Sequence, residues 1–325
     1  MPRLTQTLCL AALCGALATG TALAQDMRAP TGPIEFTVGS GAGGSPDVIL
    51  RTYAQIMNEQ GIVENPIVVQ NRTGGGHSNA YNHVLGLPGD ENTLLMLASP
   101  VFTTPIVQGT PSVIDQITPI AVLAQSELLL FTTPDSDLNS LQDVVAAATE
   151  NPGRIRVAGG SSGGNDHVLT GLLESVTGIT LTYVPHESGS AGRATFLGGN
   201  VELHFATVSE GLEMIGSGSG KPLAIFSVER RSEQALADIP TATEQGVDVV
   251  YTQFWGLGAP AGVDPAIAAW WADKFVAAAA TDQFQAWLAE NLYRSDMVTL
   301  DEAGIYFAAQ QQTFRDVLTR IGLAK

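Results

Sequence analysis

Residues 34–57 read IEFTVGSGAGGSPDVILRTYAQIM, and this stretch decides the fold. Ile34 to Val38 suit a buried strand, a turn with four glycines follows, and Ser45-Pro46-Asp47 then opens a helix. Serine, proline and aspartate are typical of a first helical turn, and we expect Ser45 to cap this helix. Because a strand, a glycine turn and a helix start direct several backbone N–H groups at one point, the stretch predicts an anion-binding site.

Three interpretations of this glycine turn remain open from the residues alone. Gly39-x-Gly41-x-x-Gly44 matches the fingerprint of dinucleotide-binding enzymes. That fold places an acid after the second strand, whereas the strand predicted at 66–70 is followed by Asn71-Arg72. The second interpretation is a turn whose glycines serve the backbone only. The third is a receptor for a small anion.

The first 24 residues are typical of a secretion signal. Arg3 supplies a basic start, Leu8 to Leu17 an apolar centre, and Ala22-Leu23-Ala24 a cleavage site. We therefore predict that residues 1–24 are removed and that the mature chain is periplasmic. Cys9 and Cys14 both lie in this segment, so the mature chain is predicted to have no disulfide and no thiol chemistry.

The charge of the chain excludes some classes of partner. The formal net charge is −17, and loss of Arg3 with the signal leaves 14 basic against 32 acidic residues, or −18. Nucleic acid and anionic membranes are therefore poor partners. The overall field also repels an anionic solute, so capture has to rely on short-range hydrogen bonds and helix ends.

The remaining sequence predicts an α/β protein with two lobes. Strand, turn and helix recur through the first hundred residues, which implies a parallel sheet that binds ligands beyond the carboxyl ends of its strands. A second glycine turn, Gly159-Gly160-Ser161-Ser162-Gly163-Gly164-Asn165, starts a similar arrangement further on. Apolar segments at 119–132 and 251–260 predict two strands that cross between the lobes as a hinge. We predict residues 25–125 and 253–325 for the first lobe and 126–252 for the second.

A serine hydrolase is the catalytic alternative. Gly160-x-Ser162-x-Gly164 matches a nucleophile elbow between a predicted strand and helix, with Ser162 as the nucleophile. In such hydrolases an acid and then a histidine follow the serine, but the last histidine is His204 and 121 residues without histidine follow it. No histidine or carboxylate spacing suits a metal, so we predict no metal and no cofactor.

Two further features are interpreted from local pattern. Thr299 and Glu302 have capping-box spacing and predict the start of the last helix. Trp255 follows a predicted strand at the return crossing, where it either belongs to the core or lines a cleft.

Several motifs in this order resemble the extracytoplasmic solute receptors of tripartite tricarboxylate transporters, the Bug-type receptors. The resemblance covers nearly all of the mature chain. Its marks are Ala42-Gly43-Gly44-Ser45-Pro46-Asp47 with Arg51, Asn71-Arg72-Thr73-Gly74-Gly75-Gly76, Gly198-Gly199 before Val201-Glu202, and Trp255-Gly256-Leu257 with Ala259-Pro260-Ala261-Gly262. Ala42 and Thr73 stand where that family usually has proline, and His77 also departs from its pattern.

The resemblance implies a two-lobed periplasmic binding protein of the type II-like class. Such a receptor is a non-enzymatic monomer that closes on a small organic acid, a di- or tricarboxylate, an amino acid or an aromatic acid, and delivers it to membrane permease subunits. Asp47 is expected to orient its loop, and Arg72 and Arg193 to form surface ion pairs. Substitution of Ser162 by alanine is expected to weaken binding. The residues implied as ligand-binding are Ser40, Gly43, Gly44, Gly75, Gly76, His77 and Ser99 in the first lobe, and Ser161, Ser162, Gly163, Asn165, His167 and Thr207 in the second.

Overall fold

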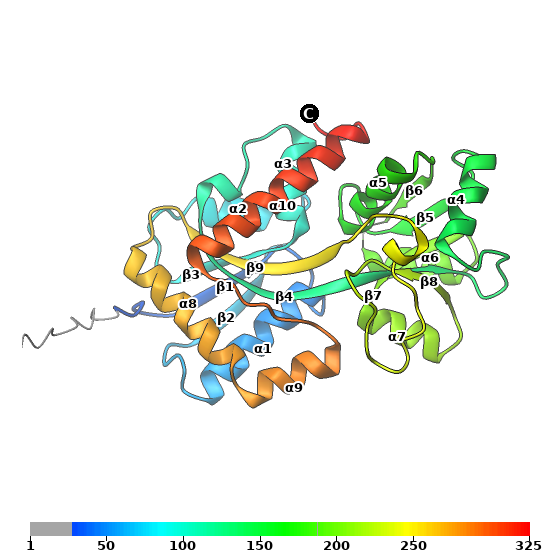
Figure 1. Ribbon diagram of the computed structural model, residues 1–325. Coiled ribbons are helices and arrows are strands. Elements are labelled where there is room, and N and C mark those ends of the chain that lie inside the picture. The colour runs from blue at the N-terminus through cyan, green and yellow to red at the C-terminus, as the bar shows by residue number, and fades with distance from the viewer. Residues whose placement is uncertain (1–27, 187) are drawn as a thin grey trace, which may run out of the picture.

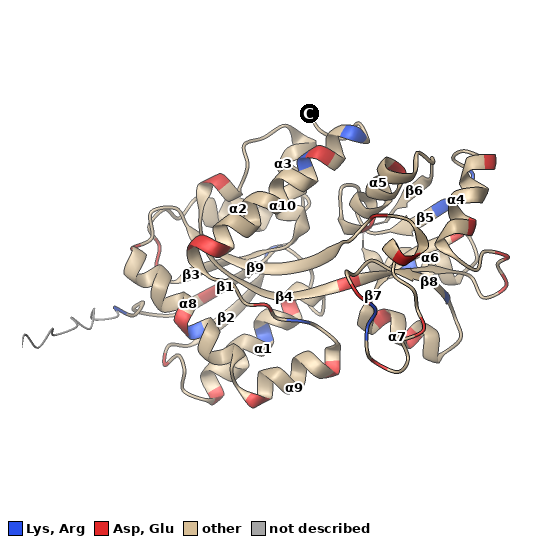
Figure 2. Ribbon diagram, viewed as in Figure 1, with Lys and Arg blue, Asp and Glu red and all other residues tan. Residues whose placement is uncertain are grey.

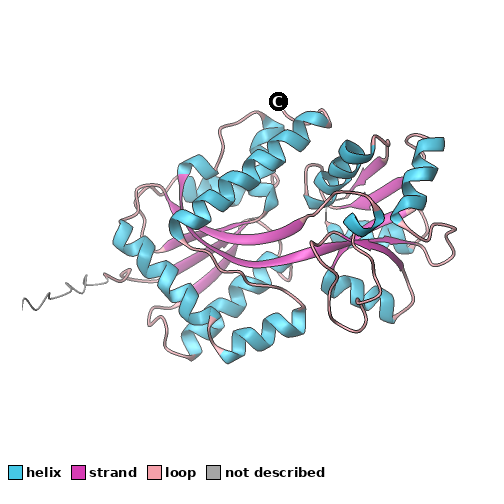
Figure 3. Cartoon of the chain, viewed as in Figure 1, coloured by secondary structure: helices cyan, strands magenta, loops and turns pink. Residues whose placement is uncertain are grey.

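The computed structural model describes residues 28–186 and 188–325, so the predicted signal at 1–24 lies outside the described residues. The chain forms two lobes joined by long strands (Figure 1). Helices pack around the strands of each lobe (Figure 3). Acidic residues outnumber basic ones and occur on both lobes (Figure 2). In the described part of the chain, no helix is long and apolar enough to cross a membrane.

The first lobe is built from both ends of the chain. Its central strand, β1, pairs in parallel with β2 on one side and with β3 on the other. The elements before the crossing are β1 (Ile34–Val38), α1 (Ser45–Glu59), β2 (Ile67–Asn71), α2 (Ser78–Leu85), β3 (Thr93–Leu97), α3 (Ser99–Gln108) and a short 3-10 helix (Ile114–Gln116). The elements after the return are α8 (Pro265–Ala279), α9 (Asp282–Asn291) and α10 (Leu300–Arg320).

The second lobe repeats the parallel arrangement. Its central strand, β5, pairs in parallel with β6 and β7. The elements are α4 (Leu141–Glu150), β5 (Arg156–Gly159), α5 (Asn165–Thr177), β6 (Thr182–Pro185), α6 (Gly189–Leu197), β7 (Leu203–Thr207), α7 (Val208–Gly216), β8 (Lys221–Ile225) and a 3-10 helix (Thr243–Gln245).

Two long strands, β4 (Ile117–Thr132) and β9 (Thr252–Pro260), cross between the lobes. They pair with each other antiparallel as far as Glu127 and Thr252, and beyond that point β4 pairs with β7 and β8. One nine-stranded sheet results, in the order β2-β1-β3-β9-β4-β7-β5-β6 with β8 beside β4. The predicted two-lobed fold class is thus confirmed, although the sheet is mixed because the crossing strands run antiparallel. The predicted lobe boundaries fall along these strands and stay a prediction.

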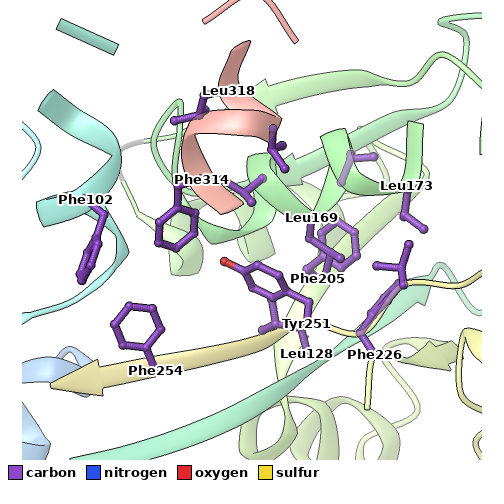
Figure 4. Packing of buried hydrophobic residues seen from close by; sticks show 14 of the residues in the cluster. Phe102, Leu128, Leu169, Leu173, Phe205, Phe226, Tyr251, Phe254, Phe314 and Leu318 are labelled. Carbon is purple, nitrogen blue, oxygen red and sulfur yellow. The ribbon is translucent and has the colours of Figure 1, made fainter. Parts of the chain in front are cut away.

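The largest core cluster is continuous across both lobes (Figure 4). Phe102 of α3, Phe254 of β9 and Phe314 of α10 form its first-lobe side, and Leu169 of α5 and Phe205 of β7 belong to its second-lobe side. The C-terminal part of α10 approaches α5 at Gly171, where a Cβ atom would lie 2.8 Å from Ile321. The helix α10 therefore packs on both lobes, which couples them through apolar contacts.

The capping box occurs at a different place from the one predicted. Thr299 precedes α10, but its side chain makes no capping hydrogen bond. The reciprocal bonds are found between Thr207 and Glu210 at the start of α7. The spacing alone could not distinguish the two sites. At α10 the first helical residue, Leu300, has a left-handed backbone with φ of 49°, which departs from an ordinary first turn.

Candidate functional site

A cavity of about 690 Å³ lies between the lobes, at the carboxyl ends of the parallel strands. Its volume is in the range of small-molecule sites. Glycine turns from both lobes form its walls, as the sequence predicted. The lining residues of the first lobe include Gly39 to Pro46, Thr73, Gly74, Gly76, His77 and Ala98 to Pro100; those from the second include Gly160, Ser161, Gly164 to Asp166, Ser188 to Ser190, His204, Phe205, Thr207 and Glu210; Leu128, Gln253 and Trp255 come from the crossing region.

The N-termini of six helices meet at this cavity. Side chains of Ser188 and Thr207 cap α6 and α7. The helices α1, α2, α3 and α5 have no side-chain cap, and their N-cap residues are Gly44, His77, Ala98 and Gly164. Uncapped helix starts present unpaired N–H groups and the positive end of the helix dipole. The cavity is therefore suited to an anion although the chain as a whole is strongly acidic.

Ser45 does not cap α1 as predicted. Gly44 occupies the N-cap position, and the hydroxyl of Tyr293 donates to Ser45 Oγ at 3.3 Å. The absence of a capping side chain leaves the first N–H groups of α1 without an internal partner.

Nine of the predicted site residues line the cavity and four do not. Those in the lining are Ser40, Gly43, Gly44, Gly76, His77, Ser99, Ser161, Asn165 and Thr207. Gly75, Ser162, Gly163 and His167 lie outside it. Gly163 instead faces α3, where a Cβ atom would lie 3.3 Å from Val107, so this glycine permits a close contact between the lobes.

The two glycine turns share one hydrogen-bond scheme. In the first, the Gly43 N–H donates to Asp47 Oδ2 at 2.9 Å, and in the second the Gly163 N–H donates to His167 Nδ1 at 3.2 Å. Gly43 and Gly163 also have the same left-handed backbone, with φ of 80° and 78°. Asp47 thus orients its loop, as predicted, and His167 performs the same task in the other lobe.

The charge of Asp47 is neutralised within the protein. Burial raises its pKa, but hydrogen bonds from Arg51, Gly43 and Asn71 outweigh burial and lower the pKa overall. His167 supplies an acceptor without a charge, because burial lowers the pKa of its imidazole. Arg72 and Arg193 form surface ion pairs, as predicted, with Glu35 and Glu213 at 3.1 and 3.3 Å.

The arrangement around Ser162 lacks the features of a nucleophile elbow. Its Oγ lies 3.5 Å from His167 Nδ1, at the limit of a hydrogen bond, and this nitrogen already accepts from Gly163. The ring of His167 stacks on Tyr183, and among the described residues no carboxylate hydrogen-bonds to it. An activated serine needs a histidine oriented by a third group.

His77 provides the most unusual backbone of the site. It follows three glycines with positive φ and itself has φ of 69°, which is uncommon for a residue with a side chain. Its ring occupies the space beside Gly39, where a Cβ atom would lie 2.4 Å from Cγ. Burial lowers the pKa of His77 to about 4, so the ring is neutral at physiological pH.

Several residues that line the cavity were not predicted from the sequence, among them Asp166, His204 and Glu210. For Trp255 the sequence left two positions open, the core or the cleft. Trp255 is fully buried and lines the cavity, so it is both core and site. Nothing in the sequence placed Asp166 in the site, because an acid in the first turn of a helix is common and usually serves the helix dipole. Glu210 had a usable signal, since Thr207-x-x-Glu210 is a capping box at the end of a strand. His204 lies within β7, where alternation predicts burial but gives no direction toward a site.

Comparison with known proteins identifies a family that matches most of this chain. The family described as "Tripartite tricarboxylate transporter family receptor" matches residues 49–315. BugT of Bordetella pertussis is 30% identical over 246 residues, which cover 73% of this chain and 73% of BugT. A UPF0065 protein in the gbd 5′ region of Cupriavidus necator is 27% identical over 316 residues, covering 95% and 93% of the two chains.

Solved structures share the fold at lower identity. A Rhodopseudomonas palustris protein solved with adipate has a TM-score of 0.76 at 22% identity, covering 91% of this chain and 99% of the other. MatC from the same species, solved with malate, has a TM-score of 0.73 at 21% identity, covering 89% and 99%. The extent of the family match, together with the two-lobed fold, shows that this chain belongs to the tripartite tricarboxylate transporter receptor family.

Proposed function

We propose that this chain is a periplasmic receptor that encloses a small organic carboxylate between its lobes and delivers it to the permease subunits of a tripartite tricarboxylate transporter. One observation carries the proposal: four helix starts without side-chain caps meet at a single cavity between the lobes. The receptor acts as a monomer and leaves its solute chemically unchanged. It reaches the periplasm through a cleaved signal at residues 1–24.

The polar groups left without partners agree with an anionic guest. Among the described residues, Ser40 Oγ, His77 Nδ1 and Trp255 Nε1 are buried and have no hydrogen-bond partner, and all three residues line the cavity. A hydroxyl and an indole N–H can each donate to a carboxylate. The two solved structures named above also hold small carboxylates, adipate and malate.

The interaction energies suffice for capture. Micromolar affinity corresponds to about −8 kcal/mol. Helix ends contribute roughly 0.3–2 kcal/mol each, and charge-assisted hydrogen bonds about 1.5–3 kcal/mol each. Several of both kinds reach this value before the cost of immobilisation, and closure of the lobes adds to it by excluding water.

A thermal-shift screen of organic acids tests the proposal. At a concentration 100 times its Kd, a bound acid stabilises the folded receptor by about 2.7 kcal/mol, which raises Tm by about 5 °C in a protein of this size. Uncharged amides of the same acids serve as controls and are expected to give no shift. A complete screen of di-, tri-, amino and aromatic acids without any shift would contradict the proposal.

A further inference from the structure

The second-lobe wall of the cavity carries two acidic side chains that no lysine or arginine neutralises. Asp166 and Glu210 both line the cavity, and no lysine or arginine does among the described residues. Within residues 28–186 and 188–325, neither carboxylate forms an ion pair. The corresponding first-lobe turn differs, because Arg51 neutralises Asp47 there. A guest with negative charge alone would therefore meet two uncompensated carboxylates.

Each of these carboxylates uses one oxygen for the protein and keeps the other free. Asp166 Oδ2 accepts from the Gly160 N–H at 2.9 Å. Glu210 Oε2 accepts from the N–H and the hydroxyl of Thr207, both at 3.1 Å. In the described part of the chain, Oδ1 of Asp166 and Oε1 of Glu210 have no hydrogen-bond partner. Two acceptors with negative charge thus remain available on one wall.

His204 adds a third acceptor on independent grounds. Its side chain is 2% exposed and lines the cavity. Nδ1 lies 3.0 Å from the carbonyl of Ala158 and must donate to it, and burial lowers the pKa of the ring. The neutral ring therefore presents Nε2 as a lone pair. Across the portion of the chain that the structure covers, this nitrogen has no hydrogen-bond partner, so it can accept from a donor in the cavity.

The kind of donor follows from the charge of these groups, since two of them are carboxylates and all three can accept a hydrogen bond. No cluster of three histidine, cysteine or acidic side chains among the described residues is close enough to hold a metal ion. An ammonium group differs from a metal ion in that it donates several N–H bonds of about 2.9 Å to separate acceptors. It also supplies the positive charge that Asp166 and Glu210 lack.

We propose that the solute is a zwitterion, whose ammonium binds Asp166, Glu210 and His204 while its carboxylate binds the uncapped helix starts of the first lobe. This inference rests on the proposed function and deepens it, because it names an amino-bearing carboxylate as the class of solute. A simple di- or tricarboxylate fits the helix starts but not the acidic wall.

Matched pairs of acids that differ only in the amino group test the inference. Titration calorimetry at pH 7.5 compares aspartate with succinate, glutamate with glutarate, alanine with propionate and phenylalanine with 3-phenylpropionate. In the pair that binds best, the amino acid is expected to bind at least tenfold more tightly. Equal or tighter binding of the acid without the amino group overturns the inference but leaves the proposed function intact. Binding of no acid at all overturns both.

Two nearly isosteric variants locate the ammonium. Asp166→Asn and Glu210→Gln keep the acceptors for Gly160 and Thr207 but remove the charge. Each is expected to weaken binding of the amino acid at least tenfold and to leave binding of its partner acid unchanged or tighter, because one repelling charge is removed. Glu213→Gln, on the same helix as Glu210 but outside the cavity, is the control and should leave both affinities unchanged. Equal losses for both acids in the two wall variants would overturn the inference.

A pH series separates this arrangement from one in which a protonated Asp166 donates to a carboxylate. Glu210 from α7, Tyr183 from β6 and Tyr251 before β9 face Asp166, and the two tyrosines stay neutral because burial raises the pKa of each. If Asp166 binds an ammonium, affinity should fall between pH 7.5 and 5 in the wild type, and fall less in Asp166→Asn. A rise in affinity over the same range would overturn the inference.

Discussion

At the scale of the residue, each lobe holds the left-handed glycine of its turn by a hydrogen bond to a side chain, but the two side chains differ in kind. Asp47 and His167 each accept the N–H of a left-handed glycine four residues earlier. Asp47 needs Arg51 and Asn71 to compensate its charge, whereas His167 is neutral. Because His167 is neutral, Asp166 has no second carboxylate next to it at the equivalent position of the second-lobe turn.

Asp166 makes the stability of the free receptor depend on pH. Burial raises the pKa of Asp166 to about 6, and the charge of Glu210 also raises it. Because the pKa is higher in the folded state than the ordinary 3.8 of an unfolded chain, folding favours the protonated carboxyl. The stabilisation from that proton is complete below pH 3.8 and is lost as pH rises through about 6.

We therefore predict that Asp166→Asn is more stable than the wild type at pH 8 when no ligand is present. The difference is up to about 3 kcal/mol, and it should shrink to near zero by about pH 4. Urea unfolding of both proteins over this range measures the difference, and all other titrating groups cancel. A difference that does not change with pH would contradict the assignment of this pKa.

The positions of Gly41 and Ser162 give opposite predictions for binding. Gly41 lines the cavity, its φ is not positive, and no described atom lies within 4 Å of a Cβ placed there. Gly41→Val should keep the fold and weaken solute binding at least tenfold, because the added methyl groups occupy the cavity. Ser162→Ala should leave affinity within twofold, since Ser162 lies outside the lining. Titration calorimetry measures both, and a large loss in Ser162→Ala would restore the original expectation from the resemblance.

At the scale of the element, the helix α6 is placed by a glycine contact. Gly192 lies against β5, where a Cβ atom would be 2.8 Å from the Gly159 carbonyl oxygen. The start of α6 supplies Gly189 and Ser190 to the cavity wall. Close approach of this helix to the strand therefore fixes one wall of the site.

We predict that Gly192→Ala destabilises the protein by about 1–3 kcal/mol, because the methyl group pushes α6 away from the backbone of β5. Gly189→Ala on the same helix is the matched control, since no described atom lies within 4 Å of its Cβ position. The control should be neutral or stabilising by less than about 1 kcal/mol. Thermal unfolding of both variants checks the pair. Similar losses in both would show that helix flexibility, rather than the contact, is responsible.

At the scale of the whole molecule, a buried ion-pair cluster holds the crossing point. Glu127 of β4 is 1% exposed and lies where this strand exchanges β9 for β7 and β8. Arg231 from the second lobe donates to Glu127 Oε2 at 3.0 Å. Arg294, near the end of the chain, places Nε 2.9 Å from Oε1, without the alignment of a hydrogen bond. The cluster thus joins segments of both lobes at the hinge.

We predict that Glu127→Gln destabilises the protein by about 1–3 kcal/mol. Arg231, whose side chain is 12% exposed, keeps only its pair with Glu233, and Arg294, whose side chain is 48% exposed, loses its partner. Urea unfolding measures the loss. Glu213→Gln breaks the exposed pair with Arg193 and should cost less than about 1 kcal/mol. If Glu127→Gln cost no more than this surface control, the cluster would have no role in holding the hinge.

The sequence by itself determined the fold class, the glycine turns and part of the candidate site. These features depend on local chemistry, namely buried apolar strands, glycines at positive φ and acids in the first turns of helices, and short segments of the chain encode them. Nine of the thirteen residues that the resemblance implied line the cavity, and most of them belong to these turns and helix starts. The resemblance also pointed to Asp47 as a residue that orients its loop, and Asp47 accepts the Gly43 N–H there.

Only the tertiary structure decided which side of each turn faces the solute. Gly163 belongs to the predicted turn and His167 to the helix after it, yet Gly163 packs against α3 and His167 stacks on Tyr183, and neither lines the cavity. The fold also places Asp166 of α5 in the same cavity as His204 of β7 and Glu210 of α7, two elements that adjoin each other in sequence but lie far along the chain from α5. Spacing along a chain fixes which groups share an element, but the crossing of β4 and β9 fixes which elements share a cavity.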